Sequence, residues 1–440
     1  MDNPERKRSW TIERTIRHEE EREYYVEVPF ELPERTEELG IEIEAAPLGE
    51  GRTVIDLGLK DPARIRGWSG GARTAVFVGR EKATPGYLPG ELTPGRWTVL
   101  LGAYRVPTGG CRVSVRVTVK PETARWLKGD LHAHTEHSDG TYTLREAGAI
   151  IEALGCDFLA TTDHNAISQN YAHPQDANLV FIPGMELTTT RGHANLLGVP
   201  APVDDFRAYG AEDIRRLVAT AKRNKAFVVL NHPHCDMCPW EWGFDVDPDA
   251  VEVWNGPWTE RNDGALAWWQ EQLAAGGRLV AVGGSDAHRP HPYVRHAWPT
   301  TWVYANTRTV EGIMEGVRAG RVFLSYAPDG PTIDLTLGSC MIGDVYEPRP
   351  GDEADFKLNL AGLREGDAVK IVSERGVEHQ FTAATDGDRA YSWPMLERLF
   401  YRVEVWRYFP EAGRELVAAL SNPVYLRGAD GERGGNGNWK

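Results

Sequence analysis

Residues 130–140 read DLHAHTEHSDG, a run that leaves an apolar, extended pattern and enters a loop rich in histidines and acids. His132 and His134 are two residues apart, so in a strand they project from the same face and can bind one metal ion together. Asp139 follows in the loop. Through residues 126–305 similar short apolar runs alternate with helical stretches, which is typical of a parallel α/β sheet or barrel.

The alternation predicts about seven strand and helix units. A Thr143 to Glu146 capping box marks the start of the first helix, and Gly155 marks its end. We expect strands in GDLHAH, CDFLATTDH, LVFIPGMEL, HANLLGV, AFVVLNH, AVEVWNG, LVAVGGSDAH and TTWVYA, and further helices in AEDIRRLVATAKRN, GALAWWQEQLAAGG and TVEGIMEGVRAG. These elements predict a barrel.

The sequences on both sides of this region are rich in short β-type runs. In CRVSVRVTV, residues 111–119, valine alternates with polar residues, as expected for an antiparallel strand with one solvated face. We therefore predict a multidomain fold, α/β plus all-β, in which a distorted (β/α)7 barrel is flanked by N-terminal and C-terminal β-sandwich domains. The predicted boundaries are 1–125 and 328–426 for the sandwiches, 126–327 for the barrel and 427–440 for a flexible tail.

Composition limits the partners of the chain. The 440 residues carry a net charge of −15, which disfavours non-specific binding to nucleic acid or to an anionic membrane. Five cysteines do not form an even disulfide framework, and the charged N-terminus lacks the apolar core of a signal peptide. We expect a cytoplasmic protein with a small-molecule substrate and no nucleic-acid or membrane partner; its oligomeric state is unknown.

Histidines and acids recur at the ends of the predicted strands of the central region, where barrel enzymes place their active sites. A lone histidine is more often a packed residue than a ligand, but a cluster of this size would be repulsive without cations. Imidazole and carboxylate ligands suit Zn, Mn, Fe, Co or Ni. The nine candidate metal ligands are His132, His134, Asp139, His164, Glu186, His193, His232, Asp286 and His288.

The motifs DLHAHTEHSDG, TDHN, GMEL, NHP and SDAH, taken in order, resemble those of the polymerase and histidinol phosphatase (PHP) domain. The preceding sandwich and the segments EVWNG, SDAHR and RAGRVFLSYAPDGP resemble the CehA/McbA branch of that family, named for carbaryl hydrolases. The resemblance implies a PHP barrel and a di- or trinuclear metallohydrolase with two or three divalent ions, Zn, Mn or Fe.

The resemblance also implies a distribution of ligands. A first metal would take His132, His134, Glu186 and Asp286, and a second would take Glu186 as a bridge with His193 and His232. A third site would use Asp139, His164 and His288. Many relatives carry a histidine at the position of Asp139, so this sequence departs from the family there.

The expected function is hydrolysis by a metal-bridging hydroxide. Asp286 would orient the hydroxide and accept its proton, His288 or His234 would protonate the leaving group, and Arg289 would bind a phosphoryl oxygen or offset the carboxylates. We expect a phosphoesterase acting on small phosphate mono- or diesters. The alternative is a carbamate, carboxylester or amide hydrolase, and less favoured readings are a non-catalytic glycan-binding protein and a proofreading exonuclease module.

Three other features have two readings each. The pair Cys235 and Cys238 could be redox-active or half a zinc site, but we expect two loop thiols without a special role. Arg191, just before His193, is a second basic candidate near the site. An aromatic wall for a substrate and plain packing are equally open for four tryptophans, Trp240, Trp242, Trp254 and Trp258.

Overall fold

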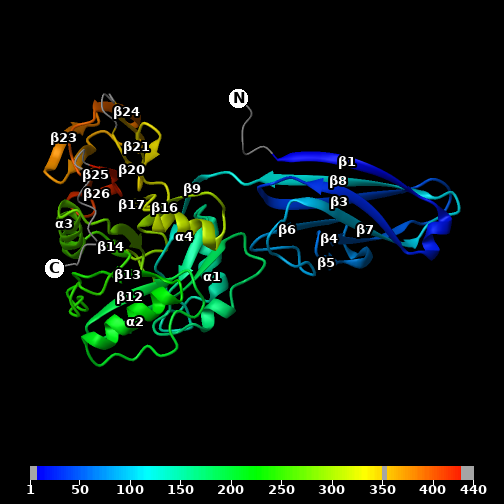
Figure 1. Ribbon diagram of the computed structural model, residues 1–440, viewed down its shortest axis with the longest axis horizontal. Helices are drawn as coiled ribbons and strands as arrows, with labels where there is room; N and C mark the ends of the chain where they lie inside the picture. Colours follow the sequence, from blue (N-terminus) through cyan, green and yellow to red (C-terminus); the bar gives the residue numbers. More distant parts are fainter. Residues whose placement is uncertain (1–6, 349–353, 428–440) are drawn as a thin grey trace. The chain divides into compact units, whose positions relative to one another are not determined.

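The computed structural model describes residues 7–348 and 354–427 of the chain (Figure 1). They divide into two compact units. One unit holds the residues up to Ala124 together with Asn306–Thr309, and the other holds Arg125–Ala305 and the chain from Val310 onward. Of the predicted tail, all but Arg427 lies outside the described residues.

Two antiparallel sheets make up the N-terminal unit. They share one apolar core, to which the alternating strand 111–119 contributes four valines that are at most 1% exposed. Short 3-10 turns lie at His18–Arg22 and Gly70–Ala72. One sheet has the order β1 (Arg8–Ile16), β8 (Cys111–Pro121), β3 (Thr36–Pro47), β6 (Ala75–Gly79); the other has the order β2 (Tyr25–Leu32), β7 (Gly95–Arg105), β4 (Val54–Lys60), β5 (Ile65–Trp68).

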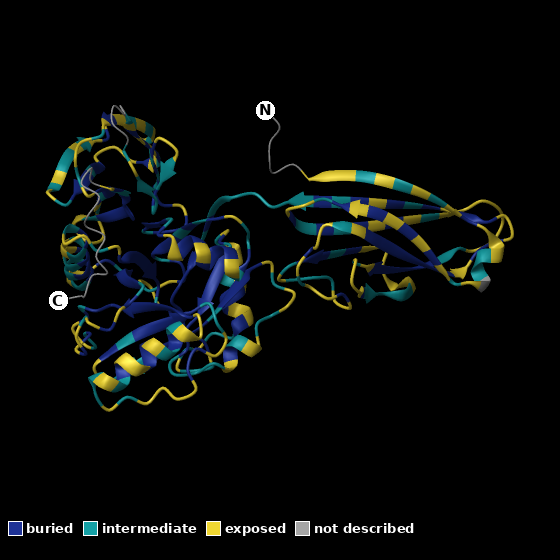
Figure 2. Cartoon of the chain, viewed as in Figure 1, coloured by how far each residue is buried: buried dark blue, intermediate teal, exposed yellow. Residues whose placement is uncertain are grey.

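The second unit is built on a long sheet in which the strands from β10 to β15, and β17, are mostly buried (Figure 2). Its first nine strands follow one another in the order β15 (Val280–Gly284), β14 (Ala250–Asn255), β13 (Phe227–Asn231), β12 (Gly192–Leu197), β11 (Val180–Thr189), β10 (Phe158–Thr161), β9 (Arg125–Asp130), β16 (Thr300–Ala305), β17 (Val322–Ser325). Because both faces of these strands are buried, their sequences are continuous apolar runs and do not alternate between apolar and polar residues.

The four predicted helices are present, and they are the α-helices of the described residues: α1 (Leu144–Ala153), α2 (Ala211–Arg223), α3 (Glu260–Ala274) and α4 (Val310–Arg318). The capping box of Thr143 and Glu146 starts α1 as predicted, and α2 buries one apolar face. The regular alternation of strand and helix does not hold. β11 and β12 form an antiparallel hairpin, and β10 is followed by a 3-10 turn, Ser168–Tyr171, in place of an α-helix.

The remaining strands extend this unit toward the C-terminus. β17 pairs with β26 (Arg414–Ser421), and the sheet continues through β25 (Phe400–Phe409), β22 (Ala368–Ser373) and β23 (Gly376–Thr382). A second sheet has the order β19 (Cys340–Met341), β18 (Thr332–Leu337), β21 (Asp355–Leu363), β24 (Gly387–Pro394), and β20 (Val345–Tyr346) pairs with β27 (Val424–Leu426). The predicted boundary between residues 327 and 328 stays a prediction.

None of the helices in residues 7–348 and 354–427 combines the length and the apolar composition that a membrane span requires.

Candidate metal centre

Two histidine-bearing segments lie side by side just beyond β9 and β15. The backbone N–H of Asp286 donates to the carbonyl of His132 (2.8 Å), and that of His134 donates to the carbonyl of Ala287 (3.0 Å). Gly284 permits this approach, because a Cβ there would collide with the side chain of His132. These contacts place His132, His134 and Asp286 around one point.

Glu186, on β11, is the most highly connected carboxylate of the cluster, and its side chain is 1% exposed. The amide of Asn231 donates to Oε1 at 2.7 Å. Five imidazole nitrogens surround the two carboxylate oxygens: His164 Nδ1 at 2.6 Å, His193 Nδ1 at 3.2 Å, His132 Nε2 at 3.3 Å, His134 Nε2 at 3.6 Å and His232 Nε2 at 3.6 Å.

The β11–β12 hairpin explains how ligands distant in sequence reach Glu186. Thr188 pairs with His193 across the hairpin, and His193 pairs in turn with Asn231 on β13. His232 follows Asn231 directly, so both histidines lie beside the carboxylate. The strand itself was predicted, but its antiparallel pairing was not, and this pairing positions a predicted ligand.

Asp286 lies between the first two histidines. Its Oδ1 is 3.1 Å from Nε2 of His134 and 3.4 Å from Nε2 of His132, and these two nitrogens are 3.1 Å apart. The two nitrogens can share a hydrogen bond when one of them carries a proton, and when both are unprotonated they suit the coordination of a shared ion.

Asp139, His164 and His288 form the more exposed side of the cluster. Oδ1 of Asp139 is 3.4 Å from Nε2 of His288 and 3.6 Å from Nε2 of His164. The side chains are 56%, 22% and 25% exposed, in the order Asp139, His288, His164, so this side is open to solvent. Nδ1 of His288 lies 2.8 Å from the carbonyl of Asp286, to which it donates, and this leaves Nε2 for an ion or a proton.

The donor set fits divalent cations. Four overlapping groups have ligand atoms that all lie within 4.8 Å of one another: His132, His134 and Asp286; His164, Glu186 and His193; His134, Asp139, His164 and His288; and His193, His232 and Cys238. Nδ1 of His134 is buried without a hydrogen-bond partner, which is costly for a polar atom that nothing binds.

The electrostatics of the cluster point the same way. Burial alone would raise the pKa of the Glu186 carboxyl, but the surrounding imidazoles, His132 first, hold that pKa well below its usual range. Burial would likewise raise the pKa of Asp286, which His132 and His134 bring well below its usual range. Burial disfavours protonation of His132, but the carboxylates, Asp286 first, raise its pKa well above the usual value. Cations must displace these protons, so metal affinity is expected to fall as the pH falls.

Sequence analysis missed the buried residues that hold the ligands. Oε1 of Glu252, on β14, lies 2.9 Å from Nδ1 of His132, and its Oε2 accepts hydrogen bonds from the backbone of His232 and the amide of Asn255, both at 3.0 Å. Asn255 also donates to Asp286 at 3.4 Å. The available signal was an acid in the otherwise apolar strand AVEVWN.

One of the residues predicted to act in catalysis, His234, lies outside the cluster. His234 packs against Phe244 and the backbone of α3 at Gly264, and its buried Nε2 has no hydrogen-bond partner. Pro233 and the positive φ of His232 (30°) end the extended conformation, so the spacing of two does not put His234 on the face of His232. The structure therefore does not bring His234 into the cluster.

The two arginines differ in their surroundings. Arg289 is exposed, and its Nη2 donates to the carbonyl of Asp139 at 3.2 Å, which keeps it next to the open side of the cluster. Arg191 pairs with Glu241 at 3.3 Å and stacks on the ring of Trp242 at 4.5 Å. Arg289 is thus the better placed of the two to meet a substrate.

Comparison with known proteins found no matching family model and no match among curated proteins. Among solved structures, a two-domain protein from Bacteroides vulgatus containing a predicted PHP-like metal-dependent phosphoesterase is 18% identical with a TM-score of 0.42, over 67% of this chain and 95% of that chain. An amidohydrolase from Chromobacterium violaceum is 17% identical with a TM-score of 0.29, over 38% of this chain and 90% of that chain. Because both TM-scores are below 0.5, these similarities carry no argument about the chemistry of this chain, which rests on the geometry of the site.

Replacing Glu252 with glutamine tests whether this carboxylate orients a ligand. The Glu252→Gln variant is expected to bind divalent metal about 10–100-fold more weakly, because His132 loses its charged partner while the volume is kept. Competition titration with a chromophoric chelator measures the affinity. Glu212→Gln, at an 89% exposed position of α2, is the matched control and should bind as the parent does. Equal affinities of both variants would show that Glu252 has no orienting role.

Proposed function

We propose that this chain is a PHP-type metal-dependent hydrolase whose substrates are small phosphate esters. The observation that carries the proposal is the convergence of five imidazoles on the buried carboxylate of Glu186, with Asp286 beside them. A buried cluster of this composition is costly as a purely structural feature and well suited to binding cations.

The cluster can be divided among two or three ions in the manner that the family resemblance implies. His132, His134, Glu186 and Asp286 would hold the first, and Glu186 would share the second with His193 and His232. Asp139, His164 and His288 would hold a third. The short distances within each set support this assignment.

Bound ions of this kind polarise a substrate oxygen and lower the pKa of a water molecule toward neutrality. Asp286 is placed to accept a proton at Oδ1, because this oxygen faces the centre while the amide of Asn255 lies near Oδ2. His288 is the candidate to protonate the leaving group through Nε2, since its Nδ1 donates to a backbone carbonyl. With His234 outside the cluster, His288 takes this role alone.

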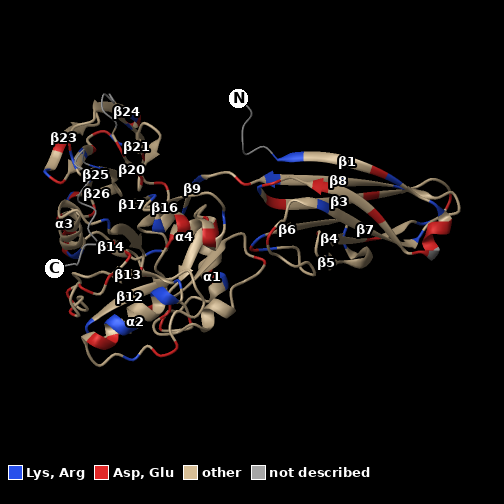
Figure 3. Ribbon diagram, viewed as in Figure 1, with Lys and Arg blue, Asp and Glu red and all other residues tan. Residues whose placement is uncertain are grey.

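The position of Arg289 favours phosphate esters as the substrate class. Its guanidinium lies at the open side of the cluster, anchored to Asp139 by a single hydrogen bond, so other N–H groups remain for the oxygens of a phosphoryl group. Acidic and basic residues are interspersed over the strands and helices (Figure 3), and together with the net charge of −15 this disfavours the exonuclease alternative.

A specific pocket favours the second candidate, hydrolysis of aryl esters or carbamates. It has a volume of about 490 Å³, which is in the range of small-molecule sites. Trp254 and Trp258 line it, whereas Trp240 and Trp242 do not, although all four are buried. The other aromatic lining residues are Tyr293, Trp298, Tyr326 and Phe409, and Arg295 and Glu411 supply charge. Trp254 and Gly256, which line the pocket, are the sequence neighbours of Asn255, whose amide donates to Asp286 at 3.4 Å.

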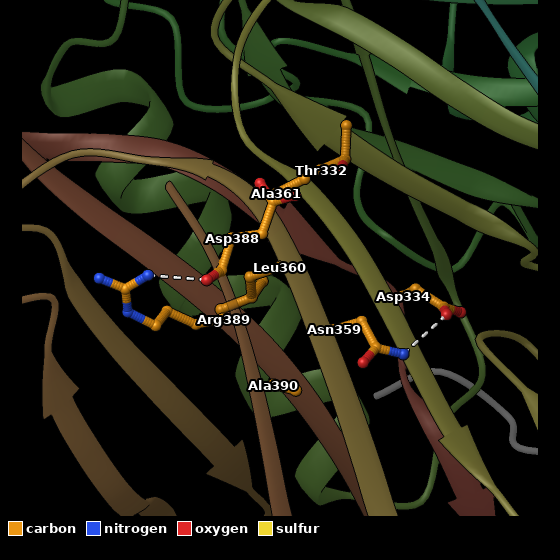
Figure 4. Close-up of a pocket in the computed structure, with 8 residues that line it drawn as sticks. All are labelled: Thr332, Asp334, Asn359, Leu360, Ala361, Asp388, Arg389 and Ala390. Carbon is orange, nitrogen blue, oxygen red and sulfur yellow. Dashed lines mark hydrogen bonds between the residues drawn. The ribbon is translucent and has the colours of Figure 1, made fainter. Parts of the chain in front are cut away.

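The glycan-binding alternative has less support. Figure 4 shows a groove across β18, β21 and β24, in which Asn359 donates to Asp334 at 3.2 Å and Arg389 donates to the carbonyl of Asp388 at 2.7 Å. None of the eight described residues that line this groove is aromatic. Sugar-binding surfaces commonly use aromatic faces, which this groove lacks.

The substrate class is tested by comparing aryl phosphate monoesters, phosphodiesters, esters and carbamates that share one leaving group. Chelation is expected to abolish hydrolysis, and added Zn, Mn or Fe to restore it. For phosphate esters Arg289→Met should lower kcat and raise KM, because charge builds up on the phosphoryl oxygens. For esters and carbamates it should change rates by about threefold or less. Arg223→Met, on α2, is the control and should leave kcat and KM unchanged for every substrate.

A parent preference for the ester or carbamate of more than about a hundredfold in kcat/KM, roughly 2.7 kcal/mol, would contradict the phosphoesterase assignment and favour the second candidate. Full activity after complete metal removal would contradict both.

A further inference from the structure

A loop between β13 and β14 brings two thiols to the metal-binding cluster. The loop turns directly after His232, where the N–H of Cys235 donates to the carbonyl of His232 (2.9 Å) and that of Trp240 donates to the carbonyl of Pro233 (3.0 Å). The N–H of Glu241 then donates to the carbonyl of Arg191 (2.9 Å), which ties the loop to the hairpin that carries His193.

The contact between the loop and the hairpin is tight. Gly192, with φ of 122°, has no side chain, and a Cβ there would lie 2.8 Å from Cα of Trp240. The loop can therefore approach His193 closely only because residue 192 is glycine. His232 has a positive φ of 30°, a conformation that costs a non-glycine residue free energy and is common at functional sites.

The loop puts Cys238 within ligand distance of two of the predicted metal ligands. Its Sγ lies 3.7 Å from Nδ1 of His232, and ligand atoms of His193, His232 and Cys238 all lie within 4.8 Å of one another. Two ligands of one tetrahedral zinc ion, with bonds of about 2.3 Å to sulfur and about 2.0 Å to nitrogen, are separated by roughly this distance. Cys235 is buried, its Sγ lies 3.4 Å from that of Cys238, and its thiol also hydrogen-bonds with the imidazole of His232.

We propose that the thiolate of Cys238 is a metal ligand, which together with His193 and His232 forms a sulfur-containing position at the edge of the cluster. The inference rests on the proposed function, because it assumes that the cluster binds divalent ions. The imidazole of His232 presents Nε2 to Glu186 and Nδ1 to Cys238. The position beside Cys238 therefore uses Nδ1 and is distinct from the one that His232 would share with Glu186 through Nε2, and a neutral imidazole serves one of the two at a time.

A thiolate ligand determines which metal the position prefers. Sulfur is a soft donor that favours zinc, cobalt and iron over manganese and magnesium, whereas imidazole and carboxylate ligands alone discriminate less. Sequence analysis treated the two cysteines as loop thiols without a special role and could not choose among the metals. A sulfur ligand from this loop makes zinc or iron the expected ion at this position and disfavours manganese.

Cobalt substitution tests the proposal without reference to catalysis. The full-length protein is reduced, its thiols are titrated to confirm reduction, and Co²⁺ is added after chelation. Visible ligand-field bands report any bound Co²⁺, and a near-ultraviolet charge-transfer band reports a bond from sulfur to cobalt. We expect both in the parent, with the ultraviolet band lost and the visible bands kept in Cys238→Ser. Cys235→Ser, the neighbouring control, and Cys340→Ser, at a distant and partly exposed thiol, should keep both.

The outcomes separate the two claims. Visible bands without a charge-transfer band in the parent would overturn the role of Cys238 and leave the metal-binding cluster intact. Loss of the charge-transfer band in Cys235→Ser but not in Cys238→Ser would show that Cys235 is the sulfur ligand and would also overturn the proposal. Absence of all cobalt bands would overturn the proposed function itself. In competition, Cys238→Ser should lower the preference for Zn²⁺ over Mn²⁺ at least about tenfold, and an unchanged preference would contradict the selectivity argument.

Discussion

Asp286→Asn is expected to lower kcat more than about a hundredfold while the fold stays intact. The substitution keeps the volume but removes the charge that lies 3.1 Å from His134 and 3.4 Å from His132. It also removes the proposed proton acceptor. The backbone should tolerate asparagine, because residue 286 has a φ of 55° and asparagine adopts this left-handed conformation more readily than most residues.

Steady-state kinetics, metal analysis and thermal unfolding of the Asp286 variant separate the explanations. A variant that is folded and inactive agrees with the proposed role. A kcat close to that of the parent, with full metal content, would mean that another group orients the nucleophile. Asp205→Asn, at a surface position paired with Arg207, is the control and should leave kcat unchanged.

Glu186→Gln is expected to have the largest effect on metal content. Glutamine has one acceptor oxygen and no charge, and it cannot balance the five imidazoles that surround residue 186. Since this carboxylate is the proposed bridge, its loss should reduce the affinity for both ions and lower kcat/KM by about a thousandfold or more, roughly 4 kcal/mol. Elemental analysis after extensive dialysis measures the metal that is retained. If this variant kept the metal content of the parent, Glu186 would not be a bridging ligand.

Residue spacing predicted the parts of the site that depend on local geometry. The spacing of two in His132 and His134, and in Asp286 and His288, keeps each pair just beyond the end of a strand, and hydrogen bonds between the two segments bring the pairs together. After His232 the chain turns at Pro233, and His234 lies outside the cluster, so its expected role in protonating the leaving group is not supported by its position. Spacing alone does not tell where a side chain points once the strand has ended.

Features that depend on tertiary pairing were not predictable from one sequence. The apolar runs of β11 and β12 fit either strand direction, since both faces are buried, and the antiparallel pairing that brings His193 to Glu186 becomes visible only in the sheet. RELVAALS, in β26, has no clear strand alternation, and its pairing with β17 and β25 decides its conformation. Glu252 stands out in the sequence as an acid in an apolar strand and Cys238 as half of a C-x-x-C pair, but neither pattern names the histidine that each contacts in the fold.

The number of metal ions bound per chain tests the central claim most directly. The full-length protein, expressed with supplemented metal and purified without chelator, is analysed by elemental mass spectrometry alongside its Glu186→Gln variant. If Glu186 and Asp286 lie in a centre with at least two metal ions, the parent carries two or more divalent ions per chain and the variant carries fewer. One ion or fewer per chain in the parent would contradict the account.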